Sequence, residues 1–283
     1  MRTRTRAVRT ASPNRRAPGR ARSAALLAGA LAAVLTGCSG APAPPAAPAP
    51  AAASPAPQAA NAPVADLPKA DTFGNLDGAV PDPSPHGTTS GEVLRVEQAV
   101  PVRSAPDGAA FAELPATQLG NPTWVPVVAR NGDWAQVLLP ARPNGATGWI
   151  RAGAADPVQA ARSPYVVEVD VDARRLKLLR DGQQVGSWTV GVGATESPTP
   201  RGRTYVMGAI RETVTRFSPI ILPLGTHSQT YSSYGGGPGT VALHGWPNPD
   251  VFGEASSDGC VRVPADALNV LKTLPLGSLV LLR

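Results

Sequence analysis

The sequence predicts a mostly β protein, with two β-rich regions in succession and a single helix near the C-terminus. Between Glu92 and Ala155, short alternating or β-rich runs are separated by turn signals and show no helical periodicity. A second set of alternating runs begins near Ser163, and the only persuasive helix starts at Pro264. We therefore expect a small barrel followed by a β-rich domain with one late helix.

Residues 1–37 have the three parts of a secretory signal. Eight arginines and no acidic residue lie in this segment, which contains an apolar run from Ala24 to Leu35 and ends in small residues. The run is short for a spanning helix, which needs about 20 apolar residues. Because eight arginines exceed the formal net charge of +6, the rest of the chain is slightly acidic. The basic composition belongs to a targeting segment and gives no reason to expect a nucleic-acid partner.

The end of this segment, Leu35-Thr36-Gly37-Cys38, resembles a bacterial lipobox, in which the cysteine is lipidated and becomes the mature N-terminus. Two alternatives are a cleaved signal with a chance cysteine and an uncleaved anchor. All three place the remaining chain outside the cytoplasm, and the first anchors it to the membrane through Cys38. The pair Arg15-Arg16 leaves the export route, Sec or twin-arginine, open.

Residues 38–91 read as a Pro/Ala-rich linker. From Ala41 to Ala65 there are thirteen alanines, eight prolines and no charge. Such a stretch cannot bury a core, and its 25 residues could extend to roughly 75 Å. Residues 66–91 remain rich in Pro, Gly and Asp, so we expect them to continue the linker.

The first folded region is expected at residues 92–157. Its predicted strands are Val93–Val96, Trp124–Val128, Trp134–Leu139 and Gly148–Ile150, with turns at Pro106–Gly108, Asn131–Asp133 and Pro143–Gly145. The segments Arg130–Val137 and Gly148–Arg151 resemble a bacterial SH3-like domain. That resemblance implies a wall-binding or peptide-binding module. Alternatively, Trp134 and Trp149 are simply core residues of a spacer.

The second region, residues 163–283, opens with a predicted three-stranded antiparallel meander. Its runs are Tyr165–Val171, Arg175–Arg180 and Gln184–Gly193, with Asp181-Gly182 as the second turn. The predicted helix follows Pro264 and covers Ala265–Lys272, and the run Ser278–Leu282 predicts a closing strand. We expect the active loop just before that helix.

Cys260 is the candidate nucleophile. The chain has two cysteines, and the other, Cys38, lies at the end of the signal segment, so Cys260 has no partner for a disulfide in the folded part. A free thiol has a pKa of about 8.5 and needs a base to become a thiolate. Of the three histidines, His244 is the candidate base, because it ends the short run Thr240–Leu243 and precedes Gly245.

The other two histidines are weaker candidates. His86 lies in the linker and His227 in a polar loop. One Cys and scattered His residues fall short of a tetrahedral zinc site, so we expect no metal. N–H groups of Gly259 and Cys260, just upstream of the predicted helix, could hold an oxyanion. Arg262 could either bind a substrate carboxylate or brace the loop.

The pattern His244-Gly245 followed by Ser257-x-Gly259-Cys260-Val261-Arg262 resembles the signature of the L,D-transpeptidase (YkuD) family. Further marks agree in order: a Val-x-Val-Asp strand ending at Asp170, Asp181-Gly182, Gly193 and Thr199-Pro200-x-Gly202. The resemblance covers about residues 163–283.

This resemblance implies a cysteine-dependent enzyme without a cofactor. Cys260 would attack the third residue, a diamino acid, of a peptidoglycan tetrapeptide stem, with His244 as base and then acid. D-Ala would leave, and the amine of a neighbouring stem would resolve the thioester to form a 3→3 cross-link. Ser257 and Gly245 would lie near the substrate. Carbapenems, which acylate this cysteine in the family, would inhibit the enzyme at the cell wall.

One departure is Asp258, where most family members have His. The carboxylate could raise the pKa of the thiol by like-charge repulsion. Three hypotheses stay open: a 3→3 transpeptidase, a carboxypeptidase or endopeptidase using the same thioester, and a non-catalytic lipid-anchored wall-binding protein. The sequence does not decide whether an amine or water is the acceptor.

Overall fold

The computed structural model describes residues 66–211, 217–234 and 236–283. Within these ranges strands dominate, and the only α-helix is α1 (Ala265–Leu271), which confirms the mostly β fold with one late helix. Pro264 caps α1 in extended conformation. The signal segment, the lipobox with Cys38 and the Ala/Pro-rich stretch up to Ala65 lie outside the described residues.

The N-terminal sheet has eight strands in the order β10-β2-β7-β8-β9-β3-β4, with β1 paired to β9. All its pairs are antiparallel. Its strands are β1 (Val80–Pro81), β2 (Glu92–Val96), β3 (Val100–Arg103), β4 (Ala110–Leu114), β7 (Trp124–Asn131), β8 (Trp134–Leu138), β9 (Ala146–Arg151) and β10 (Val158–Arg162), and a short hairpin joins β5 (Thr117–Gln118) to β6 (Asn121–Pro122). The predicted turn at Gly132 closes the β7–β8 hairpin.

The two tryptophans of this sheet differ in environment. Trp134 is buried, with the guanidinium groups of Arg103 and Arg151 over its ring at 5.9 and 5.6 Å, whereas Trp149 is half-buried in β9. The identification of residues 92–157 as SH3-like, and any ligand for it, stays a prediction.

The C-terminal region begins with a five-stranded sheet in the order β13-β12-β11-β21-β15. Its strands are β11 (Tyr165–Asp170), β12 (Arg175–Arg180), β13 (Gln183–Thr189), β15 (Gly202–Tyr205) and β21 (Leu279–Leu282). The predicted antiparallel meander is present as β11–β12–β13. Asp181 and Gly182, at φ 48° and 79°, form its tight turn, as a type I′ turn requires. The final strand β21 runs parallel to β11 and antiparallel to β15.

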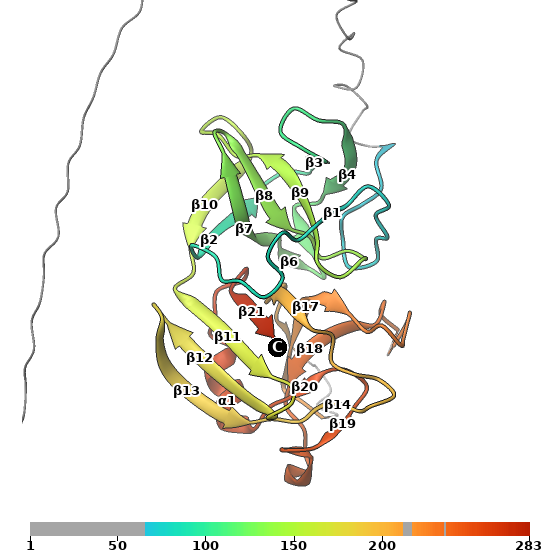
Figure 1. Ribbon diagram of the computed structural model, residues 1–283, viewed down its shortest axis with the longest axis vertical. Helices are drawn as coiled ribbons and strands as arrows, with labels where there is room; N and C mark the ends of the chain where they lie inside the picture. The colour runs from blue at the N-terminus through green and yellow to red at the C-terminus, as the bar shows by residue number, and fades with distance from the viewer. Residues whose placement is uncertain (1–65, 212–216, 235) are drawn as a thin grey trace, which may run out of the picture. The chain divides into compact units, whose positions relative to one another are not determined.

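A second C-terminal sheet has the order β16-β17-β18-β20. Its strands are β16 (Ile210–Arg211), β17 (Ile220–His227), β18 (Thr240–His244) and β20 (Val261–Arg262), while β14 (Val192–Gly193) pairs separately with β19 (Ala255–Ser257) and Pro249–Val251 form a short 3-10 turn. Figure 1 shows the N-terminal sheet in teal and green and the C-terminal sheets in yellow to red. One hydrophobic core joins the two C-terminal sheets and α1, through residues such as Leu178, Leu243 and Leu268.

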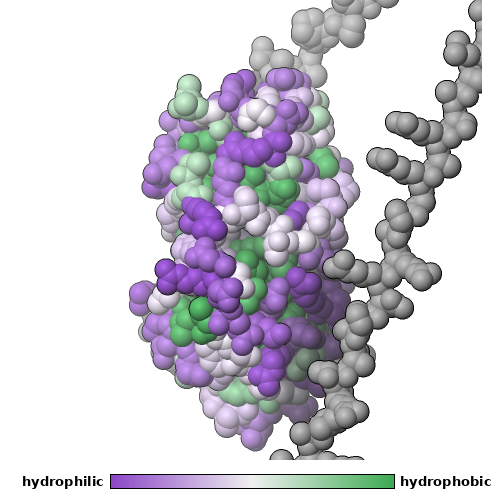
Figure 2. Space-filling view, turned by 60° about the vertical axis from the view of Figure 1, so that its left-hand side comes forward, coloured by the Kyte–Doolittle hydropathy of each residue, from purple (hydrophilic) through white to green (hydrophobic). Residues whose placement is uncertain are grey.

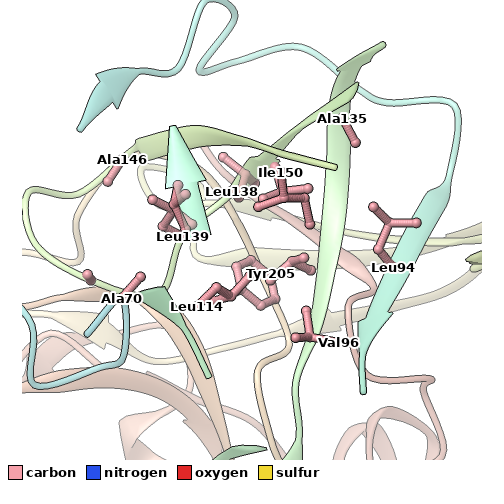
Figure 3. Close-up of a cluster of buried hydrophobic side chains, with 14 of the residues drawn as sticks. Ala70, Leu94, Val96, Leu114, Ala135, Leu138, Leu139, Ala146, Ile150 and Tyr205 are labelled. Atoms are coloured by element: carbon pink, nitrogen blue, oxygen red, sulfur yellow. The ribbon is translucent and has the colours of Figure 1, made fainter. Parts of the chain in front are cut away.

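A second core lies under the N-terminal sheet and includes residues of the C-terminal sheet. Tyr205, Met207, Leu279 and Leu281 belong to it, together with residues of the N-terminal sheet. Figure 3 shows the Tyr205 ring among side chains of the N-terminal sheet that include Leu114 and Val96. The two regions therefore share apolar contacts, which two domains on a flexible tether would not.

Residues 66–91 differ from the expected linker. Ala70 and Leu76 are fully buried, and their backbone N–H groups donate to Glu113 O (2.7 Å) and Arg142 O (2.9 Å). The Asp82 carboxylate pairs with Arg203 of β15, and both side chains are only 2% exposed. The composition hid this packing because the partners lie far along the sequence and the segment has no periodic apolar pattern.

The surface carries no large apolar expanse on the face seen in Figure 2, where hydrophobic residues form small patches among hydrophilic ones. Exposed large hydrophobic side chains of the described residues are Phe73, Val185, Tyr234 and Val270. In the part of the chain that the structure covers, no helix is long and apolar enough to cross a membrane.

Candidate active site

Two adjacent parallel strands, β18 and β20, bring the candidate nucleophile and base together. Their register pairs Leu243 with Val261 and His244 with Arg262. Because side chains alternate along a strand, Leu243 and Val261 face the core, while His244, Arg262 and Cys260 face the other side. His244, Arg262 and Cys260 all line one cavity of about 130 Å³. The structure thus brings together the thiol and imidazole that the sequence singled out.

The imidazole of His244 is held in one tautomer. Its Nδ1 lies 2.8 Å from the carbonyl oxygen of Gly245, and since a carbonyl only accepts, Nδ1 carries the proton. Nε2 therefore keeps its lone pair and can accept a proton. Burial lowers the pKa of His244 below its usual 6.5, and the charge of Arg262 acts in the same direction. The ring is neutral at neutral pH, as a general base must be.

The family resemblance implied that Gly245 lies near the substrate, but in the structure it lies behind the base. Its carbonyl orients His244, and its N–H donates to Ser218 Oγ at 2.8 Å. Ser218 is buried and in turn donates to Ile220 O at 2.6 Å. Gly245 thus orients the base, and it is absent from the cavity lining. Sequence reasoning missed Ser218, which stands in no recognisable motif.

Aromatic side chains frame the base. The Phe217 ring meets the imidazole edge-on at 5.0 Å between centroids, and Trp246 lies at 6.0 Å from it. The Arg262 guanidinium lies over the Trp246 ring, 4.0 Å from its centroid. Phe217 and Trp246 also line the cavity. Both were missed from the sequence, although Trp246 directly follows the His-Gly pair.

The Cys260 thiol is free and half-buried. Burial raises its pKa above the ordinary value, and the negative charge of Asp258 adds to this. A backbone hydrogen bond from Ala242 and the charge of Arg262 lower the pKa, but burial is the largest influence. The thiol is therefore protonated at rest and needs a base when it reacts.

Ser257 braces the loop that carries the thiol. Its hydroxyl donates to Cys260 O at 2.5 Å and accepts from the Gly259 N–H at 3.2 Å. Gly259 adopts φ 113°, a conformation that favours glycine. Ser257 lines the cavity, but its hydroxyl is already engaged within the loop.

The two N–H groups expected to form an oxyanion hole differ in their hydrogen bonds. The Gly259 N–H already has Ser257 as its acceptor, whereas the Cys260 N–H has no hydrogen-bond partner among the described residues. Strand β20 separates Cys260 from α1, which begins only at Ala265, so helix N–H groups do not surround the thiol. The helix lies close in sequence but belongs to the core on the other side of β20.

The family marks Gly193 and Thr199 have a structural place under the same loop. Thr199 Oγ1 donates to Gly259 O and accepts from the Gly193 N–H, both at 2.9 Å. A Cβ on Gly193 would come within 2.3 Å of Ser197 O, so no larger residue fits there. Ser197 Oγ donates to Ser257 O at 3.0 Å. These contacts fix the position of the turn that precedes Cys260.

Arg262 and Asp258 place opposite charges on the cavity lining. The Arg262 Nη1 donates to the carbonyl and hydroxyl of Ser256, at 3.3 and 3.2 Å, so this residue does brace the loop. The Asp258 carboxylate accepts a hydrogen bond from the Tyr234 hydroxyl, which raises the pKa of Tyr234. Tyr234 lines the same cavity.

The remaining histidines lie outside this cavity. His86 is exposed, as expected. His227 is the last residue of β17 and fully buried, in contrast to the polar loop expected for it. Its Nε2 lies 2.7 Å from Thr72 O. Across the described ranges, no group of three or more His, Cys, Asp or Glu residues could hold a metal ion.

The C-terminal region matches a known protein family. The family model for the L,D-transpeptidase catalytic domain (YkuD) matches residues 164–282. Among curated proteins, the chain is similar to the YkuD proteins of Bacillus licheniformis and Bacillus subtilis. It is 29% identical to the first over 148 residues, covering 50% of this chain and 82% of that protein. The second is 27% identical over 116 residues, covering 41% and 63%.

Solved structures similar to this chain include L,D-transpeptidases. An L,D-transpeptidase from Mycobacterium smegmatis has 13% identity and a TM-score of 0.37, covering 56% of this chain and 82% of that chain. L,D-transpeptidase 3 from Mycobacterium tuberculosis, with a faropenem-derived adduct, has 14% identity and a TM-score of 0.37, covering 50% and 75%. The family match runs from β11 to β21 and includes both strands of the Cys–His site.

Proposed function

We propose that this chain is a peptidoglycan L,D-transpeptidase, which forms 3→3 cross-links through a thioester on Cys260 and releases D-Ala. One observation is the main support. The adjacent parallel strands β18 and β20 place a free thiol and an imidazole of fixed tautomer on one face, at one cavity. This site lies inside the segment that matches the L,D-transpeptidase catalytic domain.

In the first half-reaction, His244 Nε2 takes the proton of the Cys260 thiol. The thiolate attacks the carbonyl carbon of the diamino acid at the third position of the donor stem. The tetrahedral intermediate then collapses, the C–N bond to D-Ala breaks, and the imidazolium gives its proton to the leaving amine. A thioester between the stem tripeptide and Cys260 remains.

In the second half-reaction, the side-chain amine of a neighbouring stem attacks the thioester. His244 Nε2 takes a proton from the attacking nitrogen, the C–S bond breaks, and the thiol is regenerated. Since the pKa of His244 is lowered, the ring returns readily to its neutral form. No other reactant is needed, because the peptide bond formed replaces the peptide bond broken.

The oxyanion of both intermediates needs hydrogen-bond donors. The Cys260 N–H is the donor that the described structure leaves free, so we assign it to the oxyanion. The Gly259 N–H could join only by leaving Ser257 Oγ, to which it donates at 3.2 Å. We accordingly place Ser257 and Gly245 as residues that position the thiol and the base.

The same thiol is the expected site of β-lactam attack. Because the solved Mycobacterium tuberculosis relative holds a faropenem-derived adduct, we expect carbapenems and penems to acylate Cys260. We also propose that the protein is lipid-anchored through Cys38 and works outside the cytoplasm, facing the wall. The lipobox-like end of the signal segment supports this. Loss of metabolic lipid labelling in a Cys38→Ala variant would test it.

Incubation with a disaccharide-tetrapeptide, followed by mass spectrometry of the products, tests the proposed activity. Cross-linked dimer with loss of one D-Ala is the expected result, and the Cys260→Ala variant should form none. Tripeptide alone would mean that water is the acceptor and that the protein is an L,D-carboxypeptidase. Absence of both products would favour a non-catalytic wall-binding protein.

A further inference from the structure

One wall of the cavity comes from residues 228–234 and 236–239, which we call the wall loop. Ser228, Tyr231, Tyr234 and Gly239 of this loop line the cavity together with Cys260 and His244. Within the described residues of the loop, the Ser228 N–H donates to Gly239 O at 2.8 Å, and Tyr234 and Gly237 form a reciprocal backbone pair. The Ser228 hydroxyl also accepts from the N–H groups of Thr230 and Tyr231. These bonds shape the loop itself, whereas its position relative to the thiol depends on contacts made from outside the loop.

Three of those contacts come from Arg142, in the connection between β8 and β9 of the N-terminal sheet, and a fourth is the hydrogen bond that Thr230 Oγ1 donates to Glu196 O at 3.1 Å. The Arg142 Nη1 donates to Ser228 O at 3.2 Å, and its Nη2 donates to Tyr231 O at 3.2 Å and Pro238 O at 2.8 Å. A single guanidinium thus binds the start, the middle and the end of the wall loop. Lysine could not reproduce this, because an ammonium lacks the planar fork of donors.

Arg142 is itself held in place. Its backbone N–H donates to Gly74 O, and its carbonyl accepts from the Leu76 N–H, both at 2.9 Å. These partners belong to residues 66–91, the segment that was expected to be a linker. In the described part of the chain, no carboxylate forms an ion pair with Arg142, so its partners are the loop carbonyls.

The two stems of the loop are fixed from the same side. Asn144 accepts from the His227 N–H at 2.8 Å and donates to the His227 carbonyl at 2.7 Å. Thr72 Oγ1 lies 2.6 Å from Thr240 Oγ1. The residues immediately before and after the wall loop are therefore bound to the N-terminal region, with Arg142 between them.

We propose that Arg142 is a positioning residue, through which the N-terminal region shapes the substrate-binding wall of the active site. This inference rests on the proposed function. A stem peptide extends beyond the reacting carbonyl and needs the wall, whereas the thiol and imidazole are held by β18, β20, Ser257 and Thr199. Among the described residues, Arg142 forms no side-chain hydrogen bond with any of these four. Its loss should weaken substrate binding without changing the intrinsic chemistry of Cys260.

The test compares the full protein with its Arg142→Ala and Arg142→Lys variants. For Arg142→Ala we expect KM for the donor tetrapeptide to rise at least tenfold, kcat to change less than threefold, and alkylation of Cys260 by iodoacetamide to change less than twofold. Added methylguanidinium should recover part of the KM effect in Arg142→Ala and none in Arg142→Lys. Arg130→Ala is the matched control, because Arg130 pairs with Glu92 at the surface of the same sheet.

A second readout does not depend on turnover. Access of a bulky thiol reagent, 5,5′-dithiobis(2-nitrobenzoate), relative to iodoacetamide should change at least threefold in Arg142→Ala and not in Arg130→Ala. An unchanged KM together with an unchanged reagent ratio would overturn the inference. A rise in KM accompanied by equally large falls in kcat and in iodoacetamide reactivity would also overturn it, since that pattern means general unfolding. If the wild type lacks turnover, the proposed function fails, and the reagent ratio alone decides the role of Arg142.

Discussion

At Cys260, two neighbouring charges act in opposite directions on the thiol. The Asp258 carboxylate raises its pKa and the Arg262 guanidinium lowers it, while burial has the largest effect. A thiol that stays protonated at rest avoids a permanently reactive thiolate, and in the proposed mechanism it relies on His244 at the moment of attack. Asp258, the departure from the usual family residue, shifts this balance further toward the protonated form.

Asp258→Asn should therefore lower the thiol pKa, because the substitution removes the like charge and keeps the size of the side chain. We expect the pH midpoint of Cys260 alkylation by iodoacetamide to move downward. Tyr234→Phe is the matched control, since it removes the hydrogen bond to Asp258 and keeps the carboxylate. A midpoint that stays in place or rises in Asp258→Asn would contradict this account of the site.

His244→Gln should reduce the acylation rate by about 10² to 10⁴, the usual contribution of a general base. The base works only when neutral, and its pKa is lowered, so the acidic limb of the wild-type pH–rate profile should lie below pH 6.5. That limb should disappear in the variant. Stopped-flow measurement of carbapenem acylation between pH 4 and 8 would show it. His86→Gln, a change at an exposed histidine, should leave the profile unchanged.

Among the secondary-structure elements, strand β17 ends in a buried neutral histidine, His227. Burial lowers the pKa of His227 from 6.5 to about 4, and the nearby charge of Arg142 acts in the same direction. The unfolded chain takes up a proton near pH 6.5, but the folded protein does so only near pH 4. Between these values the unfolded state binds more protons, so the free energy of unfolding falls as the pH falls.

His227→Gln should remove this dependence, because glutamine does not titrate and can still donate to Thr72 O. Urea unfolding at pH 7 and pH 4 should show that the wild type loses about 3 kcal/mol more than the variant over this range. If both proteins lose the same amount, His227 is not a buried neutral group in the folded state.

Elements with local signals could be predicted from sequence. The β11–β13 meander has alternating residues and the Asp181-Gly182 turn, and α1 has Pro264 at its start, so each follows from adjacent residues. The Cys260–His244 pair could be predicted because a thiol without a disulfide partner and an imidazole stand in one sequence motif, which runs from His244 to Arg262. Their roles remain predictions until the variants are assayed.

Other features had no local signal. Arg142 binds backbone carbonyls 86 to 96 residues away, and carbonyl groups are the same in every residue, so no sequence pattern marks the contact. Residues 66–91 look like a linker by composition, yet they pack because distant strands bury Ala70 and Leu76. The Gly259 amide was expected to face the substrate, but the nearby Ser257 hydroxyl competes for it.

For the whole molecule, the buried ion pair between Asp82 and Arg203 connects residues 66–91 to the C-terminal sheet. Both side chains are 2% exposed, and the Arg203 Nε donates to Asp82 at 2.7 Å. Removing one partner of a buried pair leaves an uncompensated charge and usually costs about 3–5 kcal/mol. Asp82→Ala should lower the free energy of unfolding by that amount in urea titrations.

The exposed pair between Asp172 and Arg201 provides the control, because surface ion pairs contribute only about 0–1 kcal/mol. A small effect of Asp82→Ala, similar to that of Asp172→Ala, would mean that residues 66–91 are not part of the cooperative fold. A fragment beginning at Glu92 lacks Asp82, Thr72 and the residues Gly74 and Leu76, which bind the backbone of Arg142. We expect it to be less stable than residues 66–283 and to bind the stem peptide more weakly.

For the protein as a whole, the central claim is that Cys260 forms a thioester with the donor stem. Peptide mapping of the protein after rapid acid quench with disaccharide-tetrapeptide would test it most directly. The account predicts a disaccharide-tripeptide acyl group on the peptide containing Cys260, loss of one D-Ala per adduct, and no adduct in Cys260→Ala. An adduct on another residue, or full turnover by Cys260→Ala, would contradict it.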